Sequence, residues 1–293
     1  MQEFWLKFKN TANDLLILTK PRITFLCLFM TLGGLGLAPG KLNILLVLAV
    51  LVGTGMAVGA ANTLNMYLER EGDKLMERTQ TRPLAVGRMN PNTALIFGLF
   101  IGASSVGLLW FCVNPLTAIL GLFAQLSYVL VYTPLKRITP LALIIGAVPG
   151  AMPPLMGWTA LTNGLEKPGI VLFLILLLWQ IPHFIAISLY LKSDYQRAGI
   201  KTIPVVRGDV NAKVQAFAYS LTMIPITLLF IPLHFAGWIY GTAALIVGLW
   251  YAGLSFKGFF EKSDSPWARK FFLASLIYLP VLTLALWIDR LIL

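Results

Sequence analysis

Apolar runs of about 20 residues recur from one end of this 293-residue chain to the other, and they constrain its fold more than any other feature. A helix needs about 20 residues to cross the roughly 30 Å hydrocarbon core of a bilayer. Hydrophobic residues make up 58% of the chain and charged residues only 12%, which would leave a water-soluble globule with too much apolar surface. We therefore expect the bilayer to be the solvent of this chain.

The apolar runs predict an all-α fold, a polytopic bundle of about nine transmembrane helices around a central cavity that opens to the cytoplasmic side. The expected spans are centred on 23–38, 43–66, 94–112, 116–132, 139–161, 169–191, 214–233, 237–255 and 271–288. No soluble domain fits between them, so residues 1–293 are expected to form one domain. Apolar and basic side chains mix in residues 4–17, so segment 1–19 is expected to be cytoplasmic and partly interfacial.

The distribution of Lys and Arg predicts the orientation of the bundle. With the N-terminus inside, all of the 23 basic residues lie on the inner side except Lys41, Lys167 and Arg290. Loops rich in Lys and Arg stay on the cytoplasmic side, so the C-terminus is expected on the outer side. The net charge of +11 follows from this rule, and it does not imply nucleic acid as a partner.

Three oxygen-bearing side chains, Asn65, Glu69 and Asp73, recur at every fourth residue where the second span ends. On a helix these positions drift by only about 80° in total, so the three side chains share one face. Such hard ligands suit Mg²⁺, which binds one or two carboxylates together with phosphate oxygens. The alternative is a helix that leaves the membrane and exposes its carboxylates to water. Asn65 lies at membrane depth and favours the site.

Basic and aromatic side chains follow this oxygen ladder (Asn65, Glu69 and Asp73). Arg78 and Arg82 could hold a diphosphate bidentately, although the orientation rule explains each of them singly. Tyr128 and Tyr132 lie at the end of the fourth span, just before Lys136. They are either membrane anchors or aromatic faces that shelter an allylic cation.

The sixth span carries polar groups in its middle, in the run Trp179-Gln180-Ile181-Pro182-His183-Phe184. Such groups must face partners or a cavity, because lipid offers no hydrogen bonds. His183 is therefore a site candidate, with packing against a neighbouring helix as the alternative. In the loop that follows, Asp194 is the only carboxylate before Ala198, so a second full ladder is absent.

These motifs resemble the haem O synthase branch of the intramembrane aromatic prenyltransferase superfamily, over roughly residues 20–208. The ladder carries the likeness to the superfamily, and the runs 146–158 and 179–184 carry the likeness to the branch. Two positions depart from the family pattern: Glu69 stands where Asp is usual, and Gly72 stands where a bulkier residue is usual. Neither departure removes a type of metal ligand.

The resemblance implies farnesyl transfer from farnesyl diphosphate to the 2-vinyl group of haem b, which gives haem O for terminal oxidases. Mg²⁺ is the implied cofactor, and haem b is a substrate. The implied setting is the lipid bilayer of a bacterial cytoplasmic (inner) membrane, with haem A synthase or terminal oxidase assembly as protein partners. Alternatives are a prenyltransferase that acts on a quinone precursor or a chlorin, and a non-enzymatic haem carrier or assembly factor.

Residue roles follow from the same resemblance. The expected metal ligands are Asn65, Glu69 and Asp73. The expected catalytic set adds Arg78, Arg82, Lys136 and Asp194. The expected substrate-binding residues are Lys20, Arg22, Tyr128, Tyr132, Arg137, Trp179, Gln180, His183, Lys192 and Tyr195. Of these, His183 is the first candidate for a haem contact, because imidazole suits haem iron. Lys20, Arg22 and Arg137 are the candidates for the haem propionates.

Overall fold

The structure is a computed structural model that describes residues 2–261 and 264–292, with side chains from residue 10 onward except that of residue 264. All regular elements in these ranges are helices, which confirms the predicted all-α fold. The chain forms two compact units, and each is described by itself. The first comprises the chain up to Arg137 with 152–164 and 197–199, and the second comprises 138–151, 165–196 and the chain from Ile200 onward.

The first unit contains most of the N-terminal half. Its helices are α1 (Gln2–Leu18), α2 (Pro21–Leu37), α3 (Ile44–Asp73), α4 (Pro91–Cys112) and α5 (Pro115–Leu126), then the π-helix η1 (Ser127–Tyr132) and the short α6 (Thr133–Leu135). Helix α3 packs against α2 and α4, and α4 packs against α5. Because α3 has 30 residues, it continues beyond the apolar span predicted for 43–66 and carries the whole oxygen ladder.

Asparagine caps set where three of these helices begin. Asn43, Asn90 and Asn114 each accept a hydrogen bond from a backbone N–H in the first turn of α3, α4 and α5, at 2.8 to 2.9 Å. The residue after the cap is Pro in α4 and α5, where the fixed φ of Pro suits the first helical position. Local sequence therefore defines these helix starts.

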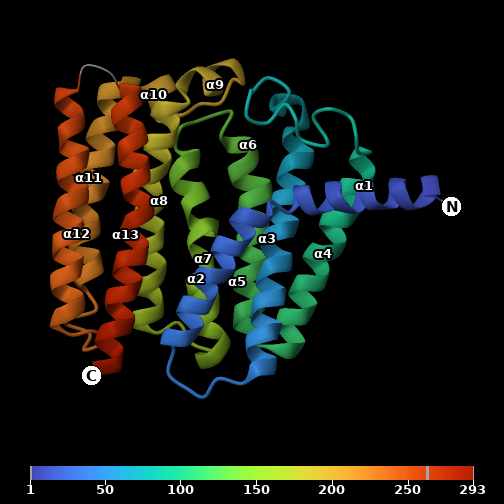
Figure 1. Cartoon of the computed structure of the whole chain (residues 1–293). Helices are drawn as coiled ribbons and strands as arrows, with labels where there is room; N and C mark the ends of the chain where they lie inside the picture. Colours follow the sequence, from blue (N-terminus) through green and yellow to red (C-terminus); the bar gives the residue numbers. More distant parts are fainter. Residues whose placement is uncertain (1, 262–263, 293) are drawn as a thin grey trace. The chain divides into compact units, whose positions relative to one another are not determined.

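Helix α1 lies crosswise to α3 and α4 (Figure 1), and a break at Thr19 and Lys20 joins it to α2. The segments Asn10–Leu18 and Pro21–Leu37 meet at 51°. Lys20 adopts a positive φ of 49° at this break, which is uncommon for a residue with a side chain. The side chains of Phe4, Trp5 and Lys7, on which the predicted surface location rests, lie outside the described residues.

Two glycines, one in α2 and one in α7 (Ala142–Thr162), lie where helix backbones approach closely. A Cβ on Gly157 would lie 2.0 Å from the Thr31 carbonyl oxygen, and a Cβ on Gly34 would lie 2.0 Å from the Pro154 carbonyl oxygen. Only glycine fits at these two contacts between α2 and the second half of α7. Small residues at such interfaces are typical of helices that pack within membranes.

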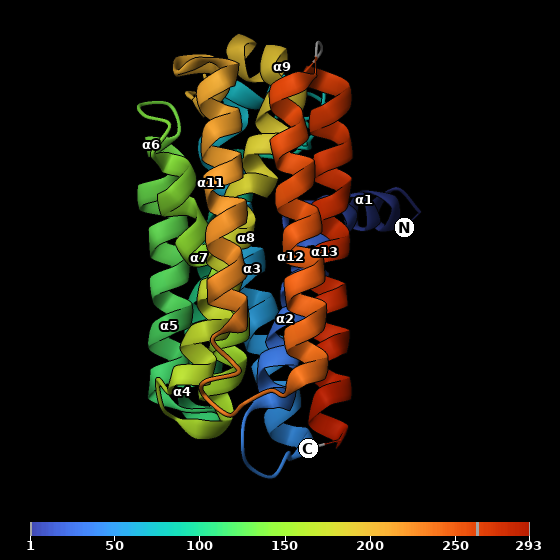
Figure 2. The same cartoon turned by 90° about the vertical axis from the view of Figure 1, so that its left-hand side faces the viewer.

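The second unit is a bundle of long helices. They are α8 (Lys167–Tyr190), α11 (Gly208–Leu228), α12 (Trp238–Lys257) and α13 (Asp264–Ile292), with the short α9 (Lys192–Arg197), α10 (Ile203–Val206) and η2 (Gly258–Phe260). Helix α8 packs against α11 and α13, and α12 packs against the same two helices (Figure 2). Pro182 lies inside α8, which continues through it to Tyr190.

A helix is present in each of the nine predicted regions, but the count of nine spans is not confirmed. In the described ranges, seven helices are long and apolar enough to cross a membrane, and the bent pair Asn10–Leu18 and Pro21–Leu37 raises this number to eight. Helix α11 is not among them, because its first half carries Asp209, Asn211, Lys213 and Gln215.

Large apolar side chains cover the outside of the helices. Phe111 is 86% exposed and Phe25 is 69% exposed, and many Leu and Ile residues on α2, α4 and α13 are exposed as well. Exposure of such an apolar surface to water costs free energy, whereas exposure to lipid hydrocarbon chains does not. The exposed side chains therefore face lipid.

Candidate active site

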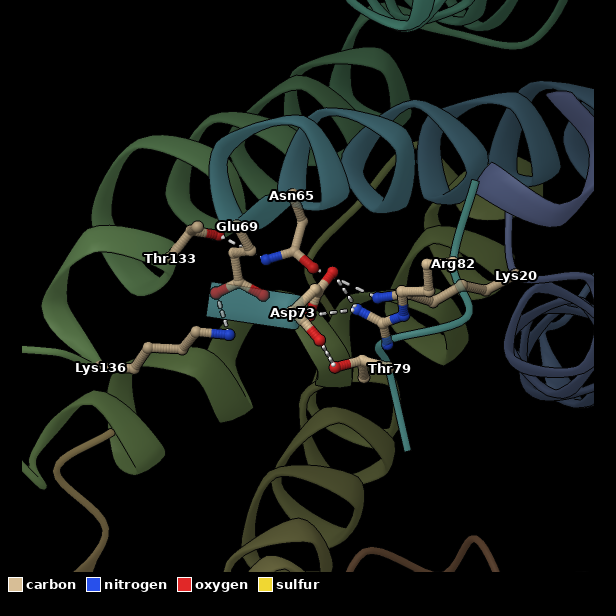
Figure 3. Close-up of polar contacts among 8 residues, drawn as sticks. All are labelled: Lys20, Asn65, Glu69, Asp73, Thr79, Arg82, Thr133 and Lys136. Atoms are coloured by element: carbon tan, nitrogen blue, oxygen red, sulfur yellow. Dashed lines mark hydrogen bonds and ion pairs between the residues drawn. The ribbon is translucent and has the colours of Figure 1, made fainter. Parts of the chain in front are cut away.

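The oxygen ladder lies on one face of α3, as its spacing predicts, and its side chains are buried. Asn65, Glu69 and Asp73 are 2%, 7% and 5% exposed. Figure 3 shows all three pointing toward the same group of basic and hydroxyl side chains. The alternative, in which Glu69 and Asp73 simply enter water at the end of a transmembrane helix, is therefore wrong.

Asp73 is paired with Arg82 and tied to the loop that follows α3. The Nη1 atom of Arg82 lies 2.9 and 2.8 Å from the two carboxylate oxygens of Asp73. The hydroxyl of Thr79 donates to the Asp73 carbonyl oxygen at 2.9 Å, and this hydroxyl is buried. The loop thus folds back on the end of the helix and brings Arg82 directly to the ladder.

Glu69 is paired with Lys136, which reaches it from just beyond α6. Both side chains are largely buried, so the ion pair is shielded from water and is stronger than a surface pair. The Lys136 ammonium also lies 5.8 Å from the centre of the Tyr132 ring. The Lys136 ammonium, which can contact phosphate, therefore lies beside both Glu69 and the face of the Tyr132 ring.

Thr133 orients the amide of Asn65. The Nδ2 atom of Asn65 donates to the Thr133 hydroxyl at 3.0 Å, and that hydroxyl donates to the Tyr128 carbonyl oxygen at 2.9 Å. The Asn65 Oδ1 atom consequently faces Lys20, whose Nζ atom donates to it at 3.2 Å. The carbonyl oxygen is the atom that a metal ion would bind, so Thr133 holds the amide in the useful orientation.

Gly72, which was expected to depart from the family pattern, lies against the end of the Arg137 side chain. A Cβ at this position would lie 2.2 Å from the Nη2 atom of Arg137. The Arg137 guanidinium thus lies close to the last turn of α3, and a larger residue at position 72 would require it to shift. The same glycine does not end the helix, because α3 continues to Asp73.

The other predicted site residues of the first unit are more open. Arg22, Arg78 and Arg137 are exposed, and Tyr128 and Tyr132 are partly buried. The two tyrosine rings lie 5.1 Å apart and are tilted by 36°, on the π-helical stretch η1. A π-helical segment changes the facing of the residues that follow it and is frequent at functional sites.

An ion pair between Asp14 of α1 and Arg88 was not anticipated by sequence reasoning. The Nε and Nη2 atoms of Arg88 donate to the Asp14 carboxylate at 2.6 to 2.9 Å. These hydrogen bonds raise the pKa of Arg88 above its usual value. Asp14 is buried. Leu18, four residues later on α1, belongs to one apolar cluster with Leu84 and Met89. Helix α1 thus holds the far end of the loop that carries Arg82.

In the second unit, Gln180 is satisfied by backbone groups. Its Nε2 atom donates to the carbonyl oxygens of Ala147 at 3.2 Å and Leu176 at 3.1 Å. Gly150 makes room for it, since a Cβ there would lie 2.0 Å from the Gln180 Oε1 atom. The glycine of one predicted motif therefore accommodates the glutamine of another.

His183 lies among aromatic rings and is bonded to α13. Its Nδ1 atom is 2.7 Å from the Ser275 hydroxyl oxygen. Its ring stacks on Trp179 at 4.5 Å and contacts Phe272 at 4.9 Å. The prediction that polar groups of the sixth span face partners is confirmed, and the partner Ser275 was not anticipated because it lies 92 residues along the chain.

The loop after α8 contains the remaining predicted residues. Asp194 is buried, Tyr195 is partly buried, and Lys192 pairs with Asp209 at 2.7 Å. All four residues belong to the second unit.

The sequence of the chain matches a known protein family. A model of the UbiA prenyltransferase family matches residues 27–276, which is most of the chain. The chain belongs to the UbiA prenyltransferase family. This membership confirms the superfamily resemblance, and together with the apolar helices it makes the chain an integral membrane protein.

Relatives with closely similar sequences are protoheme IX farnesyltransferases. The protein from Myxococcus xanthus is 50% identical over 281 residues, which cover 96% of each chain. The protein from Sorangium cellulosum is 48% identical over 239 residues, which cover 82% of this chain and 85% of the relative. The names of these relatives confirm the resemblance to the haem O synthase branch.

Solved structures share the fold at low sequence identity. A structure described as digeranylgeranylglyceryl phosphate synthase in membranes has a TM-score of 0.83 at 18% identity and covers 97% of this chain and 100% of its own. A UbiA homolog from Archaeoglobus fulgidus bound to GPP and Mg²⁺ has a TM-score of 0.69 at 17% identity and covers 93% and 99%. The family fold is thus the fold of this chain.

Proposed function

We propose that this chain transfers the farnesyl group of farnesyl diphosphate to the 2-vinyl group of haem b and so makes haem O for terminal oxidases. The observation that carries the proposal is the 50% identity, over 96% of both chains, to a relative named protoheme IX farnesyltransferase. The buried ladder with its basic neighbours supports the same conclusion from chemistry, since it suits a diphosphate.

The ladder residues fit Mg²⁺ in their donor chemistry. In the described residues no group of three or more His, Cys, Asp and Glu could hold a metal ion. Mg²⁺ does not need such a group, because it binds one or two carboxylates and takes further oxygens from phosphate and water. Asn65, Glu69 and Asp73 would hold the ion, with the Asn65 amide already oriented by Thr133.

Binding of the diphosphate would use the basic side chains that contact the ladder. Arg82 and Lys136, now paired with Asp73 and Glu69, can turn to phosphate oxygens, and the exposed Arg78 can join them. Bound Mg²⁺ would neutralise part of the negative charge that develops on the departing diphosphate. The basic side chains add to this stabilisation where charge develops, and the surrounding burial keeps bulk water away.

The transfer itself needs orientation more than covalent help from the protein. The C1–O bond of the farnesyl diphosphate breaks, and C1 bonds to the terminal carbon of the vinyl group. Water then adds to the carbon next to the porphyrin and loses a proton, which leaves a hydroxyl group. Tyr128 and Tyr132 would shelter the allylic cation with their ring faces.

For haem b, contacts can be proposed residue by residue. His183, beside Trp179 and Gln180, is the proposed contact to the iron. Lys20, Arg22 and Arg137 are the proposed partners of the propionates. Asp194 is a proposed catalytic residue, and Lys192 and Tyr195 are proposed to bind substrate.

The proposed orientation has the loops 67–92 and 192–213 on the cytoplasmic side of a bacterial inner membrane, with the C-terminus outside. Cysteine-accessibility labelling of single-cysteine variants in intact and opened cells tests this orientation. The two loops should be labelled from the same side, and labelling from opposite sides would contradict it.

Expression of the chain in cells that make haem b but lack haem O tests the activity. The predicted result is a new and more hydrophobic haem on reversed-phase chromatography. Unchanged haem b with a prenylated quinone precursor or chlorin would point to another acceptor. An altered distribution of haem b without any new pigment would instead favour a haem carrier.

A further inference from the structure

The hydrogen bond between His183 and Ser275 leaves open which atom carries the proton. The two atoms involved, Nδ1 of His183 and Oγ of Ser275, lie 2.7 Å apart. A neutral imidazole carries its proton on one ring nitrogen and a lone pair on the other. The partners of Ser275 decide between the two tautomers.

The hydroxyl proton of Ser275 is committed to a backbone carbonyl. The Oγ atom lies 2.5 Å from the carbonyl oxygen of Phe272, one helical turn back on α13. A carbonyl oxygen can only accept, so the proton in this short contact must come from the hydroxyl. The Oγ atom then has only lone pairs to offer to His183.

It follows that the Nδ1 atom of His183 is the donor in the bond to Ser275. The ring is then the Nδ1–H tautomer, and its Nε2 atom carries the free lone pair. Imidazole binds haem iron through such a lone pair, and the hydrogen bond made by the other nitrogen sets which nitrogen is available. No proton has to leave the ring when an iron–nitrogen bond forms.

Ser275 also fixes the plane in which this lone pair lies. Its backbone carbonyl oxygen accepts a hydrogen bond from Nε1 of Trp179 at 2.8 Å. Trp179 in turn stacks on His183 with an interplanar angle of 23°. One residue of α13 therefore holds the histidine through its side chain and the stacking tryptophan through its backbone, and it is completely buried.

We propose that Ser275 is a positioning residue that fixes His183 as the Nδ1–H tautomer and so presents its Nε2 lone pair to the iron of haem b. The ligand role of Nε2 rests on the proposed function. The tautomer and the role of Ser275 in setting it are properties of the protein without haem.

Nitrogen NMR on the full chain in lipid nanodiscs tests the tautomer directly. The chain has two histidines, so a His234→Asn background leaves His183 as the only ¹⁵N-histidine signal. Asn suits the replaced position, because His234 has a positive φ of 53°. The proton-bearing nitrogen is identified by its one-bond coupling to hydrogen. We expect the proton on Nδ1, and a proton on Nε2 overturns the proposal without any further variant.

Variants at position 275 test whether Ser275 sets the tautomer of His183. Ser275→Ala should lose the fixed tautomer and give a mixture, whereas Ser275→Thr keeps the hydroxyl and should restore Nδ1–H. Ser220→Ala is the matched control, since Ser220 is buried on α11 and its hydroxyl donates to the Ala216 carbonyl oxygen at 2.7 Å. An unchanged Nδ1–H signal in Ser275→Ala would show that Ser275 does not set the tautomer.

Titration with haem b then tests the ligand role. Loss of an orienting partner typically lowers metal affinity by about ten- to hundredfold, so Ser275→Ala should bind haem b that much more weakly and with a shifted Soret band. Ser275→Thr and Ser220→Ala should match the unsubstituted chain. Equal haem affinity and spectrum in Ser275→Ala would overturn the ligand role of His183. A protein that fails to bind haem b even before substitution would overturn the proposed function itself, while the NMR result would still stand.

Discussion

The Nη1 atom of Arg82 lies 2.9 and 2.8 Å from the two carboxylate oxygens of Asp73, at the buried end of α3. A metal ion at Asp73 must therefore compete with a guanidinium that is already in place. The same holds at Glu69, which is paired with Lys136. These two ion pairs would couple Mg²⁺ binding to diphosphate binding, because each basic side chain needs a new anion when it leaves its carboxylate.

Removal of the Asp73 charge should abolish prenyl transfer without unfolding the chain. Asp73→Asn keeps the shape of the side chain but loses one carboxylate of the ladder, and we expect turnover to fall at least about a hundredfold, as for the loss of a group that stabilises developing charge. Glu71→Gln is the matched control on the same helix, since Glu71 is exposed and pairs with Lys74. Near-normal turnover of Asp73→Asn at physiological Mg²⁺ would remove the ladder from the mechanism.

Mg²⁺ should bind much more tightly with diphosphate than alone. Each ion pair costs energy to open, and phosphate oxygens give Arg82 and Lys136 their new partners. We expect calorimetry to find weak binding of Mg²⁺ alone, weak binding of pyrophosphate with EDTA, and at least about tenfold tighter binding of each when both are present. Independent affinities would contradict this coupling.

The Asp14–Arg88 pair should stabilise the first unit. Arg88→Gln leaves the buried Asp14 carboxylate without its charged partner, and we expect a loss of about 1.5–3 kcal/mol in the free energy of unfolding in detergent. Asp14→Asn combined with Arg88→Gln should cost less than the two single changes added together. Strict additivity in this double-mutant cycle would mean that the two side chains do not stabilise each other.

Two adjacent glycines of α2 should respond oppositely to Ala. Gly34→Ala drives a Cβ into the Pro154 carbonyl oxygen, and we expect a loss of about 1–3 kcal/mol in the free energy of unfolding. Gly33→Ala meets no atom within 4 Å and should be neutral or slightly stabilising, because Ala favours a helix. Thermal melts in the same detergent would compare them. Equal melting temperatures would show that the close contact of Gly34 with α7 does not contribute to stability.

The parts of the site that local periodicity determines could be predicted from the sequence. The four-residue spacing of Asn65, Glu69 and Asp73 predicts that they share one helix face, as they do. Arg82, which follows them closely in the sequence, contacts Asp73. Helix starts at Asn43, Asn90 and Asn114 carry a local signal as well, since the cap and the capped N–H are within three residues.

Contacts between residues far apart in the chain could not be predicted. Thr133 lies 68 residues from Asn65, Arg88 lies 74 residues from Asp14, and Ser275 lies 92 residues from His183. Threonine and serine are ordinary in membrane helices, so nothing in their local sequence marks these two as orienting groups. The break at Lys20 could not be predicted for a different reason, because a positive φ is uncommon for a residue other than glycine and no glycine marks the position.

The most direct test is the reaction of the purified chain in liposomes with haem b, farnesyl diphosphate and Mg²⁺, followed by mass spectrometry of the pigment. We predict a product heavier than haem b by one farnesyl group and one hydroxyl group, formed only with Mg²⁺ and not by Asp73→Asn. Haem b recovered unchanged from the complete mixture, with the chain folded and both substrates bound, would contradict the proposed function.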